Sequence, residues 1–111
     1  MKNGIEKLQV ASAIDHAVLK PGATNADLER ECNIAMKYNV ATVCVKPCDV
    51  KAAVELLKGS DVKVSTVIGF PNGYTTTSCK VGEALEAIED GAIELDMVIN
   101  VGKLLSCEFD Y

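Results

Sequence analysis

The segment Glu94-Leu95-Asp96-Met97-Val98-Ile99-Asn100, ELDMVIN, decides the fold that we predict. Successive side chains of a strand point to opposite faces, so Leu95, Met97 and Ile99 share one face, and the three polar side chains share the other with Val98. A carboxylate without a partner is costly to bury. We therefore predict that the polar face of this strand borders a reaction cavity and that the apolar face meets helices.

The composition is that of an ordinary globular protein. It has 111 residues, of which 49% are hydrophobic and 24% charged, and we expect a single domain over residues 1–111. The net charge is −5 and the 11 basic residues form no stripe, so we expect no nucleic-acid partner. No apolar run approaches the roughly 20 residues of a membrane span, and the N-terminus lacks a signal-peptide pattern, which predicts no membrane partner and a cytoplasmic location.

Cysteine and histidine are arranged for neither disulfides nor a metal. The five cysteines include no CxxC pair, and His16 is the only histidine, so we expect reduced thiols and no zinc site.

Strand and helix patterns alternate along the chain. A short helix is predicted first, and after it four strand-helix units, the fourth of which is represented by its strand alone. Parallel strands joined by helical crossovers follow from this alternation. The expected helices are 4–13, 24–39, 47–57 and 76–90, and the expected extended segments are 14–22, 41–47, 62–70 and 92–99.

Two architectures have this element order, an open doubly wound sheet and part of a (β/α)8 barrel. Both faces of a doubly wound sheet meet helices and should be apolar. Here the second strand divides like the fourth, with Ala41, Val43 and Val45 on one face and Thr42, Cys44 and Lys46 on the other. This division favours the barrel, an α/β fold of which the chain would supply about the first four units.

Four motifs then lie in a particular order and spacing: DHAVLKP (15–21), ATVCVKP (41–47), VSTVIGFPNG (64–73) and GAIELDMVINVG (91–102). Together they resemble the deoxyribose-phosphate aldolase family, over nearly the whole chain from Ile14 onward. The resemblance implies a (β/α)8 barrel, of which this chain looks like the N-terminal half.

The activity implied by the resemblance is class I aldol cleavage of 2-deoxyribose 5-phosphate to acetaldehyde and glyceraldehyde 3-phosphate, without metal or cofactor. A lysine forms a Schiff base with the substrate, and a carboxylate and water move protons. Asp96 matches the family's proton-relay aspartate. The Schiff-base lysine belongs to the family's sixth strand and has no counterpart here, so we expect the chain alone to be inactive.

Further residues match positions that line or support the family's site, and each has a simpler interpretation. Asp15, placed at the end of the first strand, either supports the catalytic network or caps a turn. Lys20 either assists substrate binding or is a surface residue, and Lys46 is either a catalytic amine or a solvated loop lysine. Cys44 either lines the site or simply packs. Asn100 is taken to line the site, and Gly69, Phe70, Pro71, Asn72 and Gly73 form a substrate-facing loop.

Two alternatives remain open at the level of function. A non-catalytic half-barrel could bind a small phosphorylated ligand or pair with a second copy, since four parallel strands leave two open edges. An independent enzyme could instead use Lys46 as its amine. We also expect most apolar outer-face residues to meet helices, a homo-oligomer, and an ion pair between Asp96 and Lys46 or Lys20 if Asp96 is not catalytic.

Overall fold

A four-stranded parallel sheet organises the chain, in the order β1-β2-β3-β4. The computed structural model describes residues 7–111. The strands are β1 (Asp15–Val18), β2 (Thr42–Val45), β3 (Lys63–Ile68) and β4 (Glu94–Met97). The helices are α1 (Lys7–Ala11), α2 (Asn25–Tyr38), the 3-10 turn η1 (Pro47–Asp49), α3 (Val50–Leu56), α4 (Thr77–Glu89) and α5 (Val101–Leu105).

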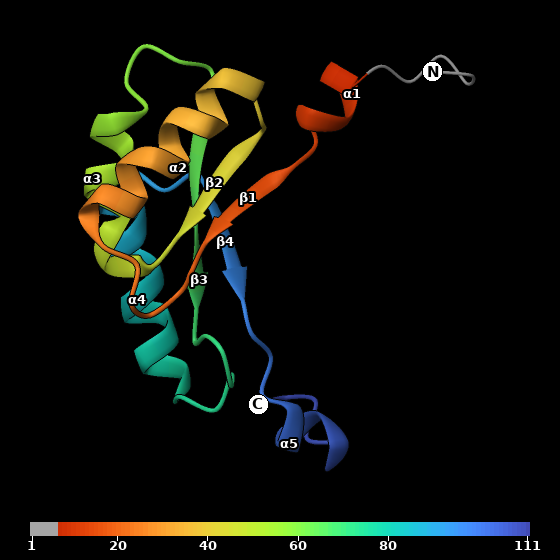
Figure 1. The fold of residues 1–111 in the computed structure, drawn as a ribbon. Coiled ribbons are helices and arrows are strands. Elements are labelled where there is room, and N and C mark those ends of the chain that lie inside the picture. The colour runs from red at the N-terminus through yellow and green to blue at the C-terminus, as the bar shows by residue number, and fades with distance from the viewer. Residues whose placement is uncertain (1–6) are drawn as a thin grey trace.

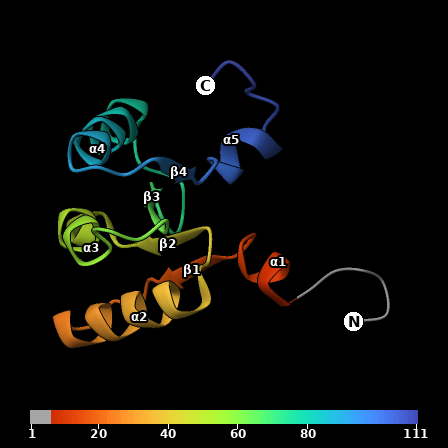
Figure 2. The same cartoon turned by 90° about the horizontal axis from the view of Figure 1, so that it is seen from above.

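Helices α2, α3 and α4 cover one face of the sheet, and α1 and α5 lie beyond its two ends (Figures 1 and 2). Val43 and Val45 of β2 and Ile68 of β3 point into this helical layer and are completely buried. They pack with α2 residues such as Cys32, also completely buried. Within residues 7–111, no helix packs over the middle of the opposite face, so the sheet has the one-sided cover of a barrel wall and not the two-sided cover of a doubly wound sheet.

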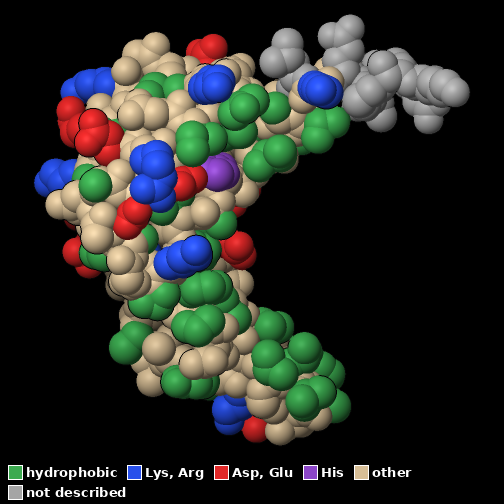
Figure 3. Space-filling view, in the orientation of Figure 1, with side chains coloured by type: hydrophobic (Ala, Val, Ile, Leu, Met, Phe, Trp, Pro, Cys, Tyr) green, Lys and Arg blue, Asp and Glu red, His purple; other side chains and the backbone are tan. Residues whose placement is uncertain are grey.

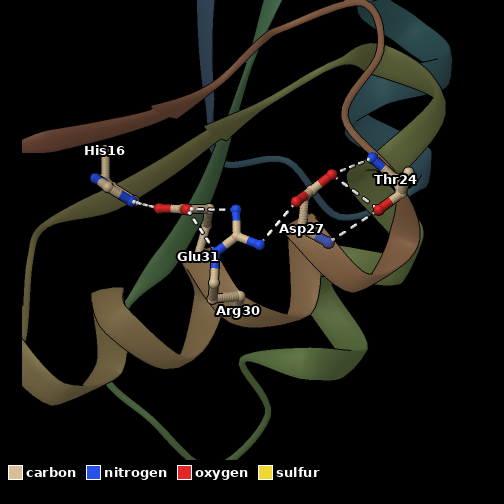
Figure 4. Close-up of polar contacts among 5 residues, drawn as sticks. All are labelled: His16, Thr24, Asp27, Arg30 and Glu31. Atoms are coloured by element: carbon tan, nitrogen blue, oxygen red, sulfur yellow. Dashed lines mark hydrogen bonds and ion pairs between the residues drawn. The ribbon is translucent and has the colours of Figure 1, made fainter.

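Helix α2 begins with a capping box. The Thr24 hydroxyl accepts from the Asp27 backbone N–H, and Asp27 accepts from the Thr24 backbone N–H at 2.8 Å. Arg30 Nη1 donates to Asp27 at 2.7 Å, and Glu31 Oε2 is hydrogen-bonded to His16 Nε2 of β1 at 2.8 Å (Figure 4). This chain of contacts fixes where α2 begins and fastens it to the edge strand.

The same contacts predict a pH dependence of stability. The Thr24 backbone N–H, with Arg30, holds the pKa of Asp27 well below its usual range, and His16 lowers the pKa of Glu31. Because both folded pKa values lie below the unfolded ones, the stabilisation is present above the ordinary carboxyl pKa values, near 4, and is lost as the pH falls through the folded values.

We expect Asp27→Asn to flatten the fall in unfolding free energy below about pH 4, measured by urea denaturation at a series of pH values. Asp61→Asn, at an exposed aspartate for which the structure gives no hydrogen bond or ion pair among residues 7–111, is the control. Equal acid sensitivity of the two variants would contradict the role of the capping contacts.

The predicted element order is confirmed. Residues 4–6 of the first predicted helix lie outside the described residues, and two details differ. Asp15 begins β1 and does not end it, since Ile14 is the last residue before the parallel ladder that pairs Asp15 with Thr42. The segment after β4 forms a further helix, α5, which the sequence reasoning did not predict.

The expectation that most apolar outer-face residues meet helices is confirmed for β1 to β3, and β4 is the exception. Leu95 packs against the core, but Ile93, Met97 and Ile99 on the same face are 62%, 52% and 57% exposed. They are exposed because no described helix lies beyond α4 on this side of the sheet. The α4 residues Val81, Leu85 and Ile88 are exposed as well.

The open side of the molecule is hollowed between the α1–β1 end and α5, and apolar side chains gather at both ends of the hollow (Figure 3). Within residues 7–111, the helices are all too short or too polar to cross a membrane.

Candidate functional site on the open face of the sheet

Three strands contribute to a polar cluster on the open face. Asp15 of β1 accepts hydrogen bonds from the Thr42 hydroxyl of β2 and, at 2.8 Å, from the Ser65 hydroxyl of β3. Thr42 and Ser65 are buried, at 3% and 1% exposure. Hydrogen bonds from a hydroxyl to a carboxylate are strong, so this cluster fixes the relative positions of the three strands.

Cys44 lies next to this cluster and is 3% exposed. Burial raises the pKa of its thiol; a hydrogen bond with Ser65 opposes the shift, and the carboxylates of Asp15 and Asp96 add to it. Because the thiolate is the nucleophilic form, a raised pKa makes Cys44 a poor nucleophile. Cys44 is therefore a buried, neutral thiol beside the cluster, and its lining of the site stays a prediction.

Thiol labelling should divide the cysteines into two classes. Cys48, Cys79 and Cys107 are exposed, whereas Cys32 and Cys44 are buried, and burial raises the pKa of Cys32 to about 11. We expect three thiols to react with iodoacetamide in the native chain at pH 7.5, and the other two only in denaturant. Peptide mass spectrometry identifies the sites, and rapid native labelling of Cys44 would contradict its buried position.

Asp96 projects from β4 toward the same face and is exposed. Its carboxylate has no hydrogen bond or ion pair within the described part of the chain. The alternative ion pair with Lys46 is not formed, because Lys46 Nζ contacts Asp49 at 3.3 Å and donates to the Ala23 carbonyl at 3.1 Å. Lys20 is exposed after β1, and no described residue bonds to its amine. Asp96 thus keeps a carboxylate available at an open surface.

At two positions, the loop after β3 has a backbone conformation that only glycine adopts readily. Gly69 and Gly73 have φ values of +64° and +69°. The Gly73 N–H donates to the Gly69 carbonyl at 2.7 Å and closes the loop. Phe70, Pro71 and Asn72 between them are exposed.

Asn100 takes a structural role that the sequence reasoning did not assign. Its side-chain oxygen accepts from the Lys103 backbone N–H at 3.0 Å and caps α5. It also borders a cavity of about 370 Å³ between α4 and α5, together with Lys80, Lys103 and Met97. Asn100 lies three residues after the end of β4, and Asp96 lies within that strand.

Comparison with known proteins identifies the family of this chain. No protein-family model matches the chain. It is 53% identical to the deoxyribose-phosphate aldolase of Caldicellulosiruptor saccharolyticus over 95% of its own length and 48% of the relative's. It is 50% identical to that of Thermoanaerobacter sp. strain X514 over 94% of its own length and 47% of the relative's. The chain belongs to the deoxyribose-phosphate aldolase family.

Structural comparison agrees. The tetrameric deoxyribose phosphate aldolase from Aeropyrum pernix superposes with a TM-score of 0.82 at 32% identity, over 87% of this chain and 42% of that one. The chain thus spans about half the length of its curated relatives and corresponds to the N-terminal half of a TIM barrel. The predicted fold class is confirmed.

Sequence reasoning assigned no role to three residues of this aldolase-family chain. Thr42 was placed on the polar face of its strand without a role, and Ser65, which alternates with apolar neighbours in the same way, was not singled out. Lys80 was passed over because a lysine in an amphipathic helix is normally solvated, whereas here it is buried. Within residues 7–111, no cluster of three potential ligands could hold a metal ion.

Proposed function

We propose that this chain forms half of a class I aldolase that cleaves 2-deoxyribose 5-phosphate to acetaldehyde and glyceraldehyde 3-phosphate. The observation that carries the proposal is the 50 to 53% identity to deoxyribose-phosphate aldolases over about half their length. The Schiff-base lysine is then supplied by the half of the barrel that lies beyond these residues. In this assignment the chain alone is inactive.

Asp96 is the proposed proton relay. It lies on the open face, its carboxylate is unpaired among the described residues, and a carboxylate with free lone pairs can accept and return a proton. Schiff-base formation at the substrate aldehyde expels water, and the iminium then accepts the electron pair of the breaking carbon-carbon bond. Asp96, through water, would exchange protons with the carbinolamine and the enamine.

The surroundings support this role without supplying the amine. Asp15, Thr42 and Ser65 hold the strands beside Asp96, and Cys44 contributes a neutral wall. The Lys46 amine is engaged by Asp49 and by the Ala23 carbonyl, which argues against a role as a free catalytic amine. The loop of residues 69–73 would face the substrate phosphosugar. We also propose a homo-oligomeric enzyme in the cytoplasm, where free thiols persist.

Reconstitution tests the proposal. Residues 1–111 are coexpressed with the C-terminal half of the Caldicellulosiruptor saccharolyticus relative and given 2-deoxyribose 5-phosphate, with and without borohydride. We expect acetaldehyde release by the pair and by neither half alone, and a reduced adduct only on the C-terminal half. A stable pair without acetaldehyde release, or an adduct on this chain, would contradict the proposal; Lys46→Met would then test the independent enzyme.

A self-assembling half-barrel is the second candidate, and the exposed apolar residues beside β4 favour it. Ile93, Met97 and Ile99 are open to solvent next to an unpaired strand edge, a surface that tends to associate. Sedimentation of the purified chain decides this candidate. A monodisperse 11.8 kDa monomer would contradict self-assembly, whereas a dimer of this chain would support it.

A further inference from the structure

Lys80 is a buried lysine on the fourth position of α4, and its environment is unusual. Its residue exposure is 9%, and lysine is rarely buried unless it is paired. Among the described residues it forms no ion pair. Its Nζ donates instead to two backbone carbonyls, that of Gly73 at 2.7 Å and that of Val98 at 2.8 Å. These bonds compensate part of the cost of removing the amine from water.

The two carbonyls belong to segments that leave neighbouring strands. Gly73 closes the loop that follows β3, and Val98 is the residue after β4. Val98 also continues the ladder, since its N–H donates to the Ile68 carbonyl at 2.9 Å. One amine therefore joins the loop to the stretch between Asp96 and Asn100.

A second residue of α4 holds the other end of the same loop. Glu83 accepts from the Gly69 backbone N–H at 2.8 Å. Residues three apart share a helix face, so Lys80 and Glu83 reach the loop from one side of α4. The Lys80 stem also packs on the loop, because a Cβ at Gly69 would lie 2.8 Å from Lys80 Cε.

We propose that Lys80 is a positioning residue, which together with Glu83 fixes the 69–73 loop against the end of β4 and so sets where Asp96 and Asn100 lie. As a role in catalysis this rests on the proposed function, whereas the positioning itself does not. Both ends of a five-residue loop are bound to a rigid helix, and that arrangement limits the positions that the loop can take. Lys80 touches no reacting atom in this scheme.

Hydrogen exchange on the 111-residue chain is the first test. Lys80→Met keeps the apolar stem and removes both donors, and Lys51→Met, at an exposed lysine of α3, is the matched control. We expect the hydrogen-bonded amides of Gly69, Gly73 and Val98 to exchange about ten times faster in Lys80→Met, with the β2 amides unchanged. Unchanged exchange, or equal acceleration throughout the sheet, would overturn the proposal.

If Lys80→Met does not fold, it has no protected amides, and a second variant then tests the proposal. Glu83→Leu releases only Gly69, so selective acceleration within residues 69–73 supports the proposal, and uniform or absent acceleration overturns it. In the reconstituted barrel we expect Lys80→Met to lower kcat more than it raises KM. An inactive wild-type pair would contradict the proposed function and leave the exchange result intact; an active pair with unaltered exchange would contradict this inference alone.

Discussion

Replacing Asp96 by asparagine is expected to slow aldol cleavage in the reconstituted barrel by a factor of about 10² to 10⁴, the usual contribution of a positioned proton-transfer group. Asparagine has nearly the same shape but cannot accept and return a proton. Because Asp96 is exposed and forms no hydrogen bond with the described residues, folding and association with the second half should be retained. The effect should therefore fall on kcat.

Glu94→Gln is the matched control for this variant. Glu94 is on the same strand, faces the same side two residues earlier, and is exposed. We expect it to keep the wild-type rate within a few-fold. Acetaldehyde release is measured with a coupled dehydrogenase, and association of the halves by gel filtration. Equal rates for Asp96→Asn and wild type would contradict the relay, and equal losses in both variants would indicate a general electrostatic effect of this face.

The alternation of side chains was sufficient to predict which face of the sheet is open. In β2, Val43 and Val45 pack under helices, while Thr42 belongs to the polar cluster and Cys44 lies beside it. This worked because side-chain direction in a strand depends only on position along the chain. The same rule identified Asp96, whose placement on the open face needs no knowledge of any partner.

Tertiary contacts set the limits of that reasoning. From the sequence, Lys80 is expected to be a surface residue. Its partners are the backbone carbonyls of Gly73 and Val98, and because every residue has such a carbonyl, the sequence does not reveal them. Asp15 was placed at the wrong end of β1, since the start of a short strand depends on the ladder with β2. The exposure of Ile93 depends on what lies beyond α4, which no local pattern encodes.

Replacing Gly73 by alanine should cause the largest loss of stability among single substitutions in the 69–73 loop. A Cβ at this position would lie 2.1 Å from the Ile99 carbonyl oxygen and 2.8 Å from its carbon. These are backbone atoms, so the contact is relieved only if the loop moves away from the end of β4. A left-handed alanine alone costs about 1–2 kcal/mol. With the clash added, we expect a loss of about 3 kcal/mol or more in the free energy of unfolding.

Two other glycines separate these contributions in urea denaturation. Gly59 has φ +83° with open space around it, so Gly59→Ala should cost about 1–2 kcal/mol from the backbone alone. Gly82 lies inside α4 with nothing within 4 Å, so Gly82→Ala should stabilise by about 0.5–1 kcal/mol. A loss at Gly73 no greater than that at Gly59 would mean that the loop moves freely away from Ile99. That result would contradict close packing of the loop on β4, the arrangement on which the positioning of Asp96 and Asn100 by α4 depends.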